Sequence, residues 1–293
     1  MKVQIFHILF CLLLLISACD NSKKVTVPSI IEGNYLFLGH IYENPSTIDT
    51  RLVNVDYSKY QQIWLGGDIC SETTRKASTI DYLDGFFNLG SNTTHWTLGN
   101  HDIRNGNIDW ITSCTERKTF YSHHFDGITL LVLNTTFRKP ADCEIMDEQM
   151  NLIRSITDTI SHSSHLIVLA HHLMWGAIDS RVKLSEISNS DASWVPFQCD
   201  PVARFQDVVY PKLIDVQKKG IDVLWIAGDL GQKATDYEFI SDEGIAFLAS
   251  GISAEIRWND RFPTCGKQDK VLKLTHDIVD RKITWDFVNI ETL

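Results

Sequence analysis

Residues 94–102 read THWTLGNHD, and this stretch decides how the rest of the chain is interpreted. Hydrophobic residues alternate with smaller or polar ones up to Gly99, which predicts a short β-strand that stops at that glycine. Asn100, His101 and Asp102 then offer an amide oxygen, an imidazole and a carboxylate at one point of the chain. Such groups can serve as a metal ligand, as a general acid or base, and as a residue that orients the acid or base. The alternative for this segment alone is a strand that ends in a solvated polar turn.

Four other apolar runs also end in a residue that can bind metals, namely His40, Asp68, His171 and Asp229. Together with the run that ends at Asn100 they make five, and four of the five terminal residues directly follow a glycine. Buried strands of an α/β sheet are continuous apolar runs, and ligands bind beyond their carboxyl ends. If the five strands are neighbours, their terminal side chains form a mixed nitrogen and oxygen site, which suits Mn, Zn, Fe or Ni.

The remaining pattern predicts an α/β fold. Asp126-Gly127 between two β-prone runs predicts a hairpin. Helical spacing or composition predicts helices over residues 73–89, 107–114, 147–160 and 201–219, with Pro211 kinking or dividing the last. Residues 173–199 are expected to form a long loop, and residues 245–249, 271–275 and 283–288 to form closing strands.

Composition limits the classes of function. The chain has 293 residues and is 44% hydrophobic, which is enough for one large α/β domain or two small ones. Its net charge of -10 argues against nucleic acid as a partner, because phosphate backbones require lysine and arginine. A small phosphorylated substrate stays compatible, since a bound metal can reverse the local charge. The oligomeric state is open.

The N-terminus has the pattern of a secretory signal. Lys2 precedes an apolar stretch, and small residues lead to Cys19. This end resembles the lipobox of bacterial lipoproteins, which implies cleavage after residue 18 and lipidation of Cys19. Residues 19–33 are then a tether, 34–293 the functional domain, and the protein lies in the cell envelope, facing the periplasm or the exterior. The alternatives are an ordinary signal peptide and, less favoured because the run is short, a membrane-spanning helix.

Five further cysteines are expected in the mature domain, at positions 70, 114, 143, 199 and 265. Export permits disulfides, and an odd number leaves at least one cysteine free or paired outside the chain. No pair has the spacing of a zinc ribbon, and the sequence does not assign the connectivity.

Gly67-Asp68, residues 99–102 and His171, in this order and spacing, resemble the calcineurin-like metallophosphoesterase family. The similarity extends from Tyr35 to Asp229. The resemblance implies two mixed β-sheets packed as a sandwich and flanked by helices, with a two-metal centre that hydrolyses phosphate esters by metal-activated water.

Carried over by position, the resemblance implies that the metal ligands are His40, Asp68, Asn100, His171 and Asp229, with Asp68 shared between two ions. His101 would stabilise the phosphoryl group or protonate the leaving oxygen, and Asp102 would orient His101.

Several further residues near these motifs are candidates from their position alone. Arg104 and Asn105 follow the motif closely and are candidates for substrate binding, with a solvated, capped turn as the alternative. Other histidines offer extra candidates for which a structural role is favoured, at positions 123, 124 and 172.

The chain departs from the family pattern at two ligand positions. Leu38 replaces the expected aspartate, and Gly231 replaces a histidine. We therefore expect one metal at the second site, and a second ion only if other groups such as Glu43, Asp56 or the phosphate itself contribute.

Two functions remain in competition. The first is a lipid-anchored, exported phosphoesterase that acts on a phosphomonoester or phosphodiester. The second is a degenerate relative that binds a ligand or partner without turnover.

Overall fold

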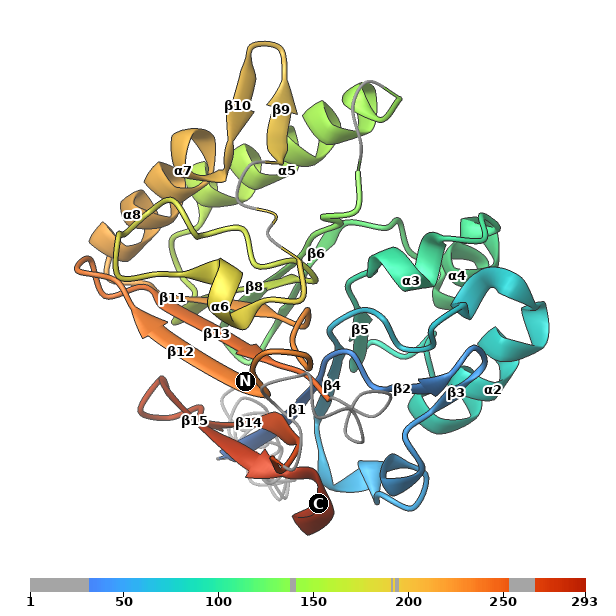
Figure 1. Ribbon diagram of the computed structural model, residues 1–293. Helices are drawn as coiled ribbons and strands as arrows, with labels where there is room; N and C mark the ends of the chain where they lie inside the picture. The colour runs from blue at the N-terminus through green and yellow to red at the C-terminus, as the bar shows by residue number, and fades with distance from the viewer. Residues whose placement is uncertain (1–31, 138–140, 191, 193–194, 253–266) are drawn as a thin grey trace, which may run out of the picture. The chain divides into compact units, whose positions relative to one another are not determined.

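A five-stranded mixed sheet contains three of the strand ends on which the site depends (Figure 1). Its order is β15 (Lys282–Asn289), β14 (Lys270–Asp277), β1 (Glu32–Leu38), β4 (Gln62–Leu65) and β5 (Thr94–Trp96). The strands β1, β4 and β5 are parallel, so their carboxyl ends lie at the same edge, whereas β14 is antiparallel to both of its neighbours, β1 and β15. The computed structural model describes residues 32–137, 141–190, 192, 195–252 and 267–293, so the predicted signal segment and Cys19 lie outside the described residues.

A six-stranded mixed sheet contains the other two strand ends. Its order is β12 (Asp236–Ile240), β13 (Ala246–Ser250), β11 (Asp222–Ala227), β8 (His165–Ala170), β7 (Ile128–Val132) and β6 (Tyr121–Phe125). The four central strands are parallel, and the two edge strands are antiparallel to their neighbours. The expected β6–β7 hairpin is confirmed, and Asp126 and Gly127 both have positive φ, at 46° and 77°.

Three apolar clusters hold the layers together, and the predicted α/β class is confirmed. One cluster joins the five-stranded sheet to α2 (Ala77–Phe87) and α4 (Ile108–Thr115). A second joins the six-stranded sheet to α5 (Cys143–Thr159), α7 (Phe205–Val208) and α8 (Tyr210–Lys218). The third takes side chains from both sheets, including Phe37, Trp64 and Leu169, so the sheets share one apolar layer.

Shorter elements connect the layers. They are β2 (Tyr42–Asn44), β3 (Thr47–Ile48), η1 (Thr50–Leu52), η2 (Tyr57–Lys59), η3 (Thr73–Arg75), α3 (Asn100–Ile103), α6 (Leu184–Ile187), β9 (Pro196–Cys199), β10 (Val202–Arg204) and η4 (Ile290–Thr292).

Two expectations about these connections need correction. The expected loop 173–199 contains α6 and β9, because short elements without periodicity leave no sequence signal. The expected helix 201–219 is divided into β10, α7 and α8, with Pro211 in the first turn of α8, where its missing N–H is tolerated.

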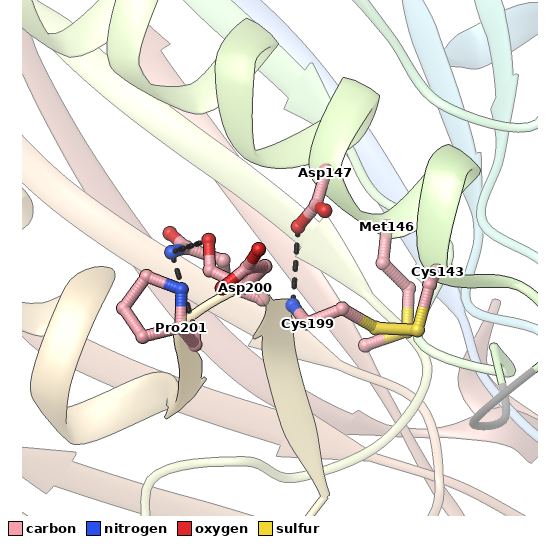
Figure 2. The surroundings of a disulfide bond; sticks show 7 residues. Cys143, Met146, Asp147, Cys199, Asp200 and Pro201 are labelled. Carbon is pink, nitrogen blue, oxygen red and sulfur yellow. Dashed lines mark hydrogen bonds between the residues drawn. A yellow bond between two sulfur atoms is a disulfide. The ribbon is translucent and has the colours of Figure 1, made fainter.

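A disulfide joins Cys143, the first residue of α5, to Cys199, the last residue of β9 (Figure 2). The backbone N–H of Cys199 also donates to the Asp147 carboxylate at 3.1 Å, one turn further along α5. Cys70 and Cys114 are free thiols, and Cys265 lies outside the described residues.

Within the described part of the chain, no helix has both the length and the apolar character needed to cross a bilayer.

Candidate metal centre

Glycines allow the strand ends of the two sheets to approach one another. A Cβ atom added at Gly39 would lie 2.6 Å from the Cα atom of Gly228, and one at Gly67 would lie 2.7 Å from the backbone nitrogen of Gly99. Both distances are far below normal contact, so side chains larger than hydrogen would force the strand ends apart. The glycines that precede four of the predicted ligands therefore create the close approach on which a shared site depends.

Asp68, His171 and Asp229 come together at this point, as the sequence predicted. The Nε2 atom of His171 lies 3.5 Å from Oδ2 of Asp68 and 3.9 Å from Oδ1 of Asp229. All three residues are buried, with at most 2% of their surface exposed. Donor atoms bound to one zinc ion in a tetrahedron at about 2.1 Å would be about 3.4 Å apart. The observed spacings are close to this value, so the three side chains fit one cation with little movement.

The hydrogen bonds of His171 leave one ring nitrogen available. Its Nδ1 atom lies 2.8 Å from the Gly66 carbonyl oxygen, which can only accept, so Nδ1 carries the proton. Nε2 is buried and has no hydrogen-bond partner among the described residues. A buried ring nitrogen that faces two carboxylates and makes no hydrogen bond is suited to binding a cation.

In the absence of a cation a proton can occupy the same place. Burial opposes protonation of His171, but Asp68 and then Asp229 outweigh it and raise the His171 pKa to about 10. Burial also opposes ionisation of Asp68, yet His171 outweighs it and lowers the Asp68 pKa below its usual range. A proton on Nε2 and a metal at Nε2 are therefore alternatives.

His172 joins this group, although sequence reasoning favoured a structural role for it. One ligand atom each from His171, His172 and Asp229 lie within 4.8 Å of one another, so this group could hold a metal ion. The Nδ1 atom of His172 lies 2.9 Å from Thr135 Oγ1 and 3.1 Å from the Thr135 carbonyl oxygen. Burial, followed by the neighbouring His171, lowers the His172 pKa to about 4, which keeps the ring neutral.

Asp102 has a different role from the one expected. Its two carboxylate oxygens accept from five donors, which are the backbone N–H groups of Asp68, Ile69 and Gly99, the Thr73 hydroxyl and the Trp96 indole. The carboxylate thus binds the turn after β4 to the start of α3 and does not contact the His101 ring, which corrects the expectation that it orients His101. The sequence could not show this, because the acceptor role depends on a backbone turn 34 residues away.

His101 is held by other groups. Its backbone N–H donates to Asp68 Oδ1 at 2.8 Å, and its Nδ1 atom lies 3.0 Å from the Ser71 carbonyl oxygen. Tyr42 stacks on the ring at 5.2 Å between centroids and an interplanar angle of 22°. The guanidinium of Arg104 lies 2.9 Å from Nε2, which itself is 4.0 Å from Asp68 Oδ2. Burial is the main reason why the His101 pKa is lowered.

The remaining candidates follow β1 or lie in and after α3. His40 follows β1, is buried, and its Nδ1 atom donates to the Ile252 carbonyl at 2.9 Å. Its ring is 6.5 Å from the His101 ring, between centroids. Asn100 begins α3 and is partly buried, whereas Asn105 is exposed.

The positions that depart from the family pattern contribute no ligand here. Leu38 is fully buried in an apolar cluster, and a Cβ at Gly231 would lie 3.2 Å from His40 Nδ1. Asp56 caps η2, accepts from Ser58 and has a side chain that is 54% exposed, so it does not join the buried group. Glu43 is partly buried on β2.

Comparison with known proteins finds no matching family model and no significant match among curated proteins. The assignment of a function therefore depends on the residues and their geometry.

Proposed function

We propose that this protein is a metal-dependent phosphoesterase of the calcineurin-like type, with one dependable divalent cation. The single observation that carries the proposal is the position of the buried Nε2 atom of His171 between the carboxylates of Asp68 and Asp229. The sharing of one apolar layer by two mixed sheets, with helices packed beside each sheet, fits the sandwich that the family resemblance implies.

The residues divide into two roles. Asp68, His171, His172 and Asp229 would hold the cation, with His40 and Asn100 as further ligands beside Asp68. A bound divalent cation supplies charge stabilisation at a phosphoryl oxygen and lowers the pKa of water. His101 lies beside Asp68 and is partly exposed, where, when protonated at Nε2, it could bind a phosphoryl oxygen or hand a proton to a leaving oxygen.

Export and lipid anchoring belong to the same proposal. The Cys143–Cys199 disulfide fits an oxidising compartment. The pattern that precedes Cys19 has the character of a signal peptide that would direct export. The proposed partners are a small phosphorylated substrate and the membrane that holds the lipid.

The competing function is a degenerate relative that binds a ligand without turnover. The observation that favours it is the apolar burial of Leu38 and the absence of a side chain at Gly231, which weaken the first metal position. Turnover separates the two functions, because a bound metal is compatible with both.

The test combines metal content with hydrolysis of 4-nitrophenyl phosphate. We expect the mature domain to retain about one equivalent of Mn²⁺ or Zn²⁺ after gel filtration and to hydrolyse the ester. The His171→Ala variant should lose both properties, and the exposed control His162→Ala should keep both. Metal retention without turnover of mono- or diesters would establish the binding protein instead, and failure to retain any offered metal would refute the site.

A further inference from the structure

Arg104 contacts His101, whose Nε2 atom lies 4.0 Å from Asp68 of the proposed centre. It is the C-cap residue of α3, it is exposed, and its guanidinium donates to Nε2 of His101 at 2.9 Å. The direction of this hydrogen bond is fixed, because Nδ1 of His101 donates to the Ser71 carbonyl and arginine has no acceptor. Nε2 must therefore be the acceptor in this arrangement.

The hydrogen bond from Arg104 occupies the Nε2 atom of His101. The ring is already fixed by Ser71 at Nδ1 and by stacking on Tyr42, so Nε2 is its remaining contact point. A substrate oxygen can reach His101 Nε2 only if the guanidinium moves. A negatively charged oxygen would attract the guanidinium more strongly than a neutral imidazole does.

Local charge makes a positive side chain necessary at this place. Asp68, Asp102 and Asp229 contribute three buried carboxylates, and Asp102 accepts from five donors, as an ionised group does. With one divalent cation the centre keeps a net charge of about -1 if the histidines are neutral. A dianionic phosphate would gain little from such a centre, so a guanidinium at its edge is needed to balance the charge.

We propose that Arg104 is the specificity-determining residue of the site and that it selects terminal phosphate groups, that is, phosphomonoesters. This inference rests on the proposed function. A monoester has three non-bridging oxygens, so one can face the cation while two remain for the planar fork of Arg104. A diester has only two non-bridging oxygens, so one faces the cation and one is left for Arg104. A diester also carries one negative charge fewer than a dianionic monoester. On binding, Arg104 leaves His101 and pairs with the phosphate.

The experiment compares two substrates in four proteins loaded with Mn²⁺. The substrates are 4-nitrophenyl phosphate and bis(4-nitrophenyl) phosphate, and the proteins are the wild type, Arg104→Gln, Arg104→Lys and the control Arg204→Gln. Arg204 is exposed on β10 and its charge change matches that of Arg104→Gln. We expect Arg104→Gln to lower kcat/KM for the monoester by about 30-fold and for the diester by less than about 3-fold, because a bidentate charged contact is lost for one substrate only. Arg104→Lys should fall between, and Arg204→Gln should equal the wild type.

A second measurement does not depend on turnover. Inorganic phosphate is titrated into each metal-loaded protein by calorimetry, and we expect its affinity to fall at least 10-fold in Arg104→Gln and to stay unchanged in Arg204→Gln. An equal loss for both substrates, or unchanged phosphate affinity in Arg104→Gln, would overturn the role of Arg104. A wild type that binds metal and phosphate but hydrolyses neither ester would refute the proposed function, while the phosphate titration would still decide the role of Arg104.

Discussion

At the scale of single residues, the site depends on groups that hold the backbone as much as on groups that face a ligand. Asp102 is fully buried and makes no contact with the imidazole beside it, yet it satisfies three backbone N–H groups of two separate turns. Each of those turns carries a proposed functional residue, Asp68 or His101. Residues of this kind are expected to control both stability and the geometry of the site.

Replacement of Asp102 by asparagine tests this role. An asparagine presents an NH₂ group to backbone donors, so at least one buried N–H loses its acceptor, and we expect the free energy of unfolding to fall by about 3 kcal/mol. Urea unfolding of Asp102→Asn and of His101→Gln measures the difference. His101 is partly exposed, so His101→Gln should change stability by less than about 1 kcal/mol. Equal effects of the two substitutions would contradict the structural role of Asp102.

Gly99 gives a second test at the same scale. A Cβ at Gly99 would lie 2.5 Å from the backbone nitrogen of Asp68 and would also overlap its carboxylate, so Gly99→Ala should destabilise the protein by about 3 kcal/mol and abolish metal retention. The matched control is Gly85→Ala in α2, where a Cβ meets no atom within 4 Å and alanine is the better helix former. Thermal unfolding should show a gain of up to about 1 kcal/mol for this control. A stable, metal-binding Gly99→Ala would disprove the tight packing.

At the scale of elements, two contacts tie neighbouring strands and helices together away from the centre. His95 on β5 is fully buried, and its Nδ1 atom lies 3.1 Å from the Tyr121 hydroxyl on β6, a strand of the other sheet. The disulfide between α5 and β9 is the second such contact. We expect each of them to contribute to stability.

The His95 contact predicts acid sensitivity. Burial, and after it His123 and Arg117, lower the His95 pKa to about 3, whereas a histidine in the unfolded chain has a pKa of about 6.5. The unfolded state therefore binds the extra proton between these values, and stability is full above about pH 6.5 and falls as the pH drops toward 3. Between pH 7 and 4.5 we expect His95 to account for a loss of about 2 kcal/mol.

The measurement is the difference between the unfolding free energies at pH 7 and 4.5, obtained in urea. In His95→Gln this difference should be smaller than in the wild type, because glutamine does not titrate. His162→Gln, at an exposed position, serves as the control and should keep the wild-type difference. An unchanged pH dependence in His95→Gln would show that this histidine is not kept neutral by burial.

The disulfide prediction concerns α5 and β9. Cys143 and Cys199 are 56 residues apart, so the bond restricts a long segment of the unfolded chain. We expect the double variant Cys143→Ser, Cys199→Ser to lose about 2–4 kcal/mol of unfolding free energy. A reducing agent should destabilise the wild type by a similar amount and leave the double variant unchanged, which calorimetry can check. Reduction without any change in melting temperature would contradict the prediction.

At the scale of the whole molecule, the proposed centre joins the ends of strands from both sheets. Asp68 follows a strand of the five-stranded sheet, and His171 and Asp229 follow strands of the six-stranded sheet. A cation bound by all three would link the two sheets at one edge. Metal binding should therefore stabilise the fold as a whole.

Metal titration tests this link. At a free Mn²⁺ or Zn²⁺ concentration about 100 times Kd, binding to the native state alone adds about 2.7 kcal/mol, which corresponds to about 5 °C in Tm for a chain of this size. Removal of the metal with a chelator should reverse the shift. Asp68→Asn should abolish it and the exposed control Asp56→Asn should not. A metal-independent Tm in the wild type would count against a shared cation.

The α/β class, the sheet strands that carry the candidate site and the residues at their ends could be predicted from the amino-acid sequence alone. Apolar runs that end in glycine and a polar residue are local features, and a strand that is buried on both faces of a sheet shows itself as such a continuous apolar run. For the same reason the hairpin at Asp126-Gly127 could be predicted from two residues.

The contacts that these strand ends make became visible only in the folded molecule. The acceptor role of Asp102, the approach of His172 to Asp229 and the pairing of Cys143 with Cys199 each join segments far apart in the chain, or depend on which way a ring turns. Such contacts are fixed by packing of one sheet against the other and by burial, which no local pattern encodes. The surroundings of the His171 ring belong to this second group, because the atoms of Gly66, Asp68 and Asp229 that face its two nitrogens come from two other strand ends.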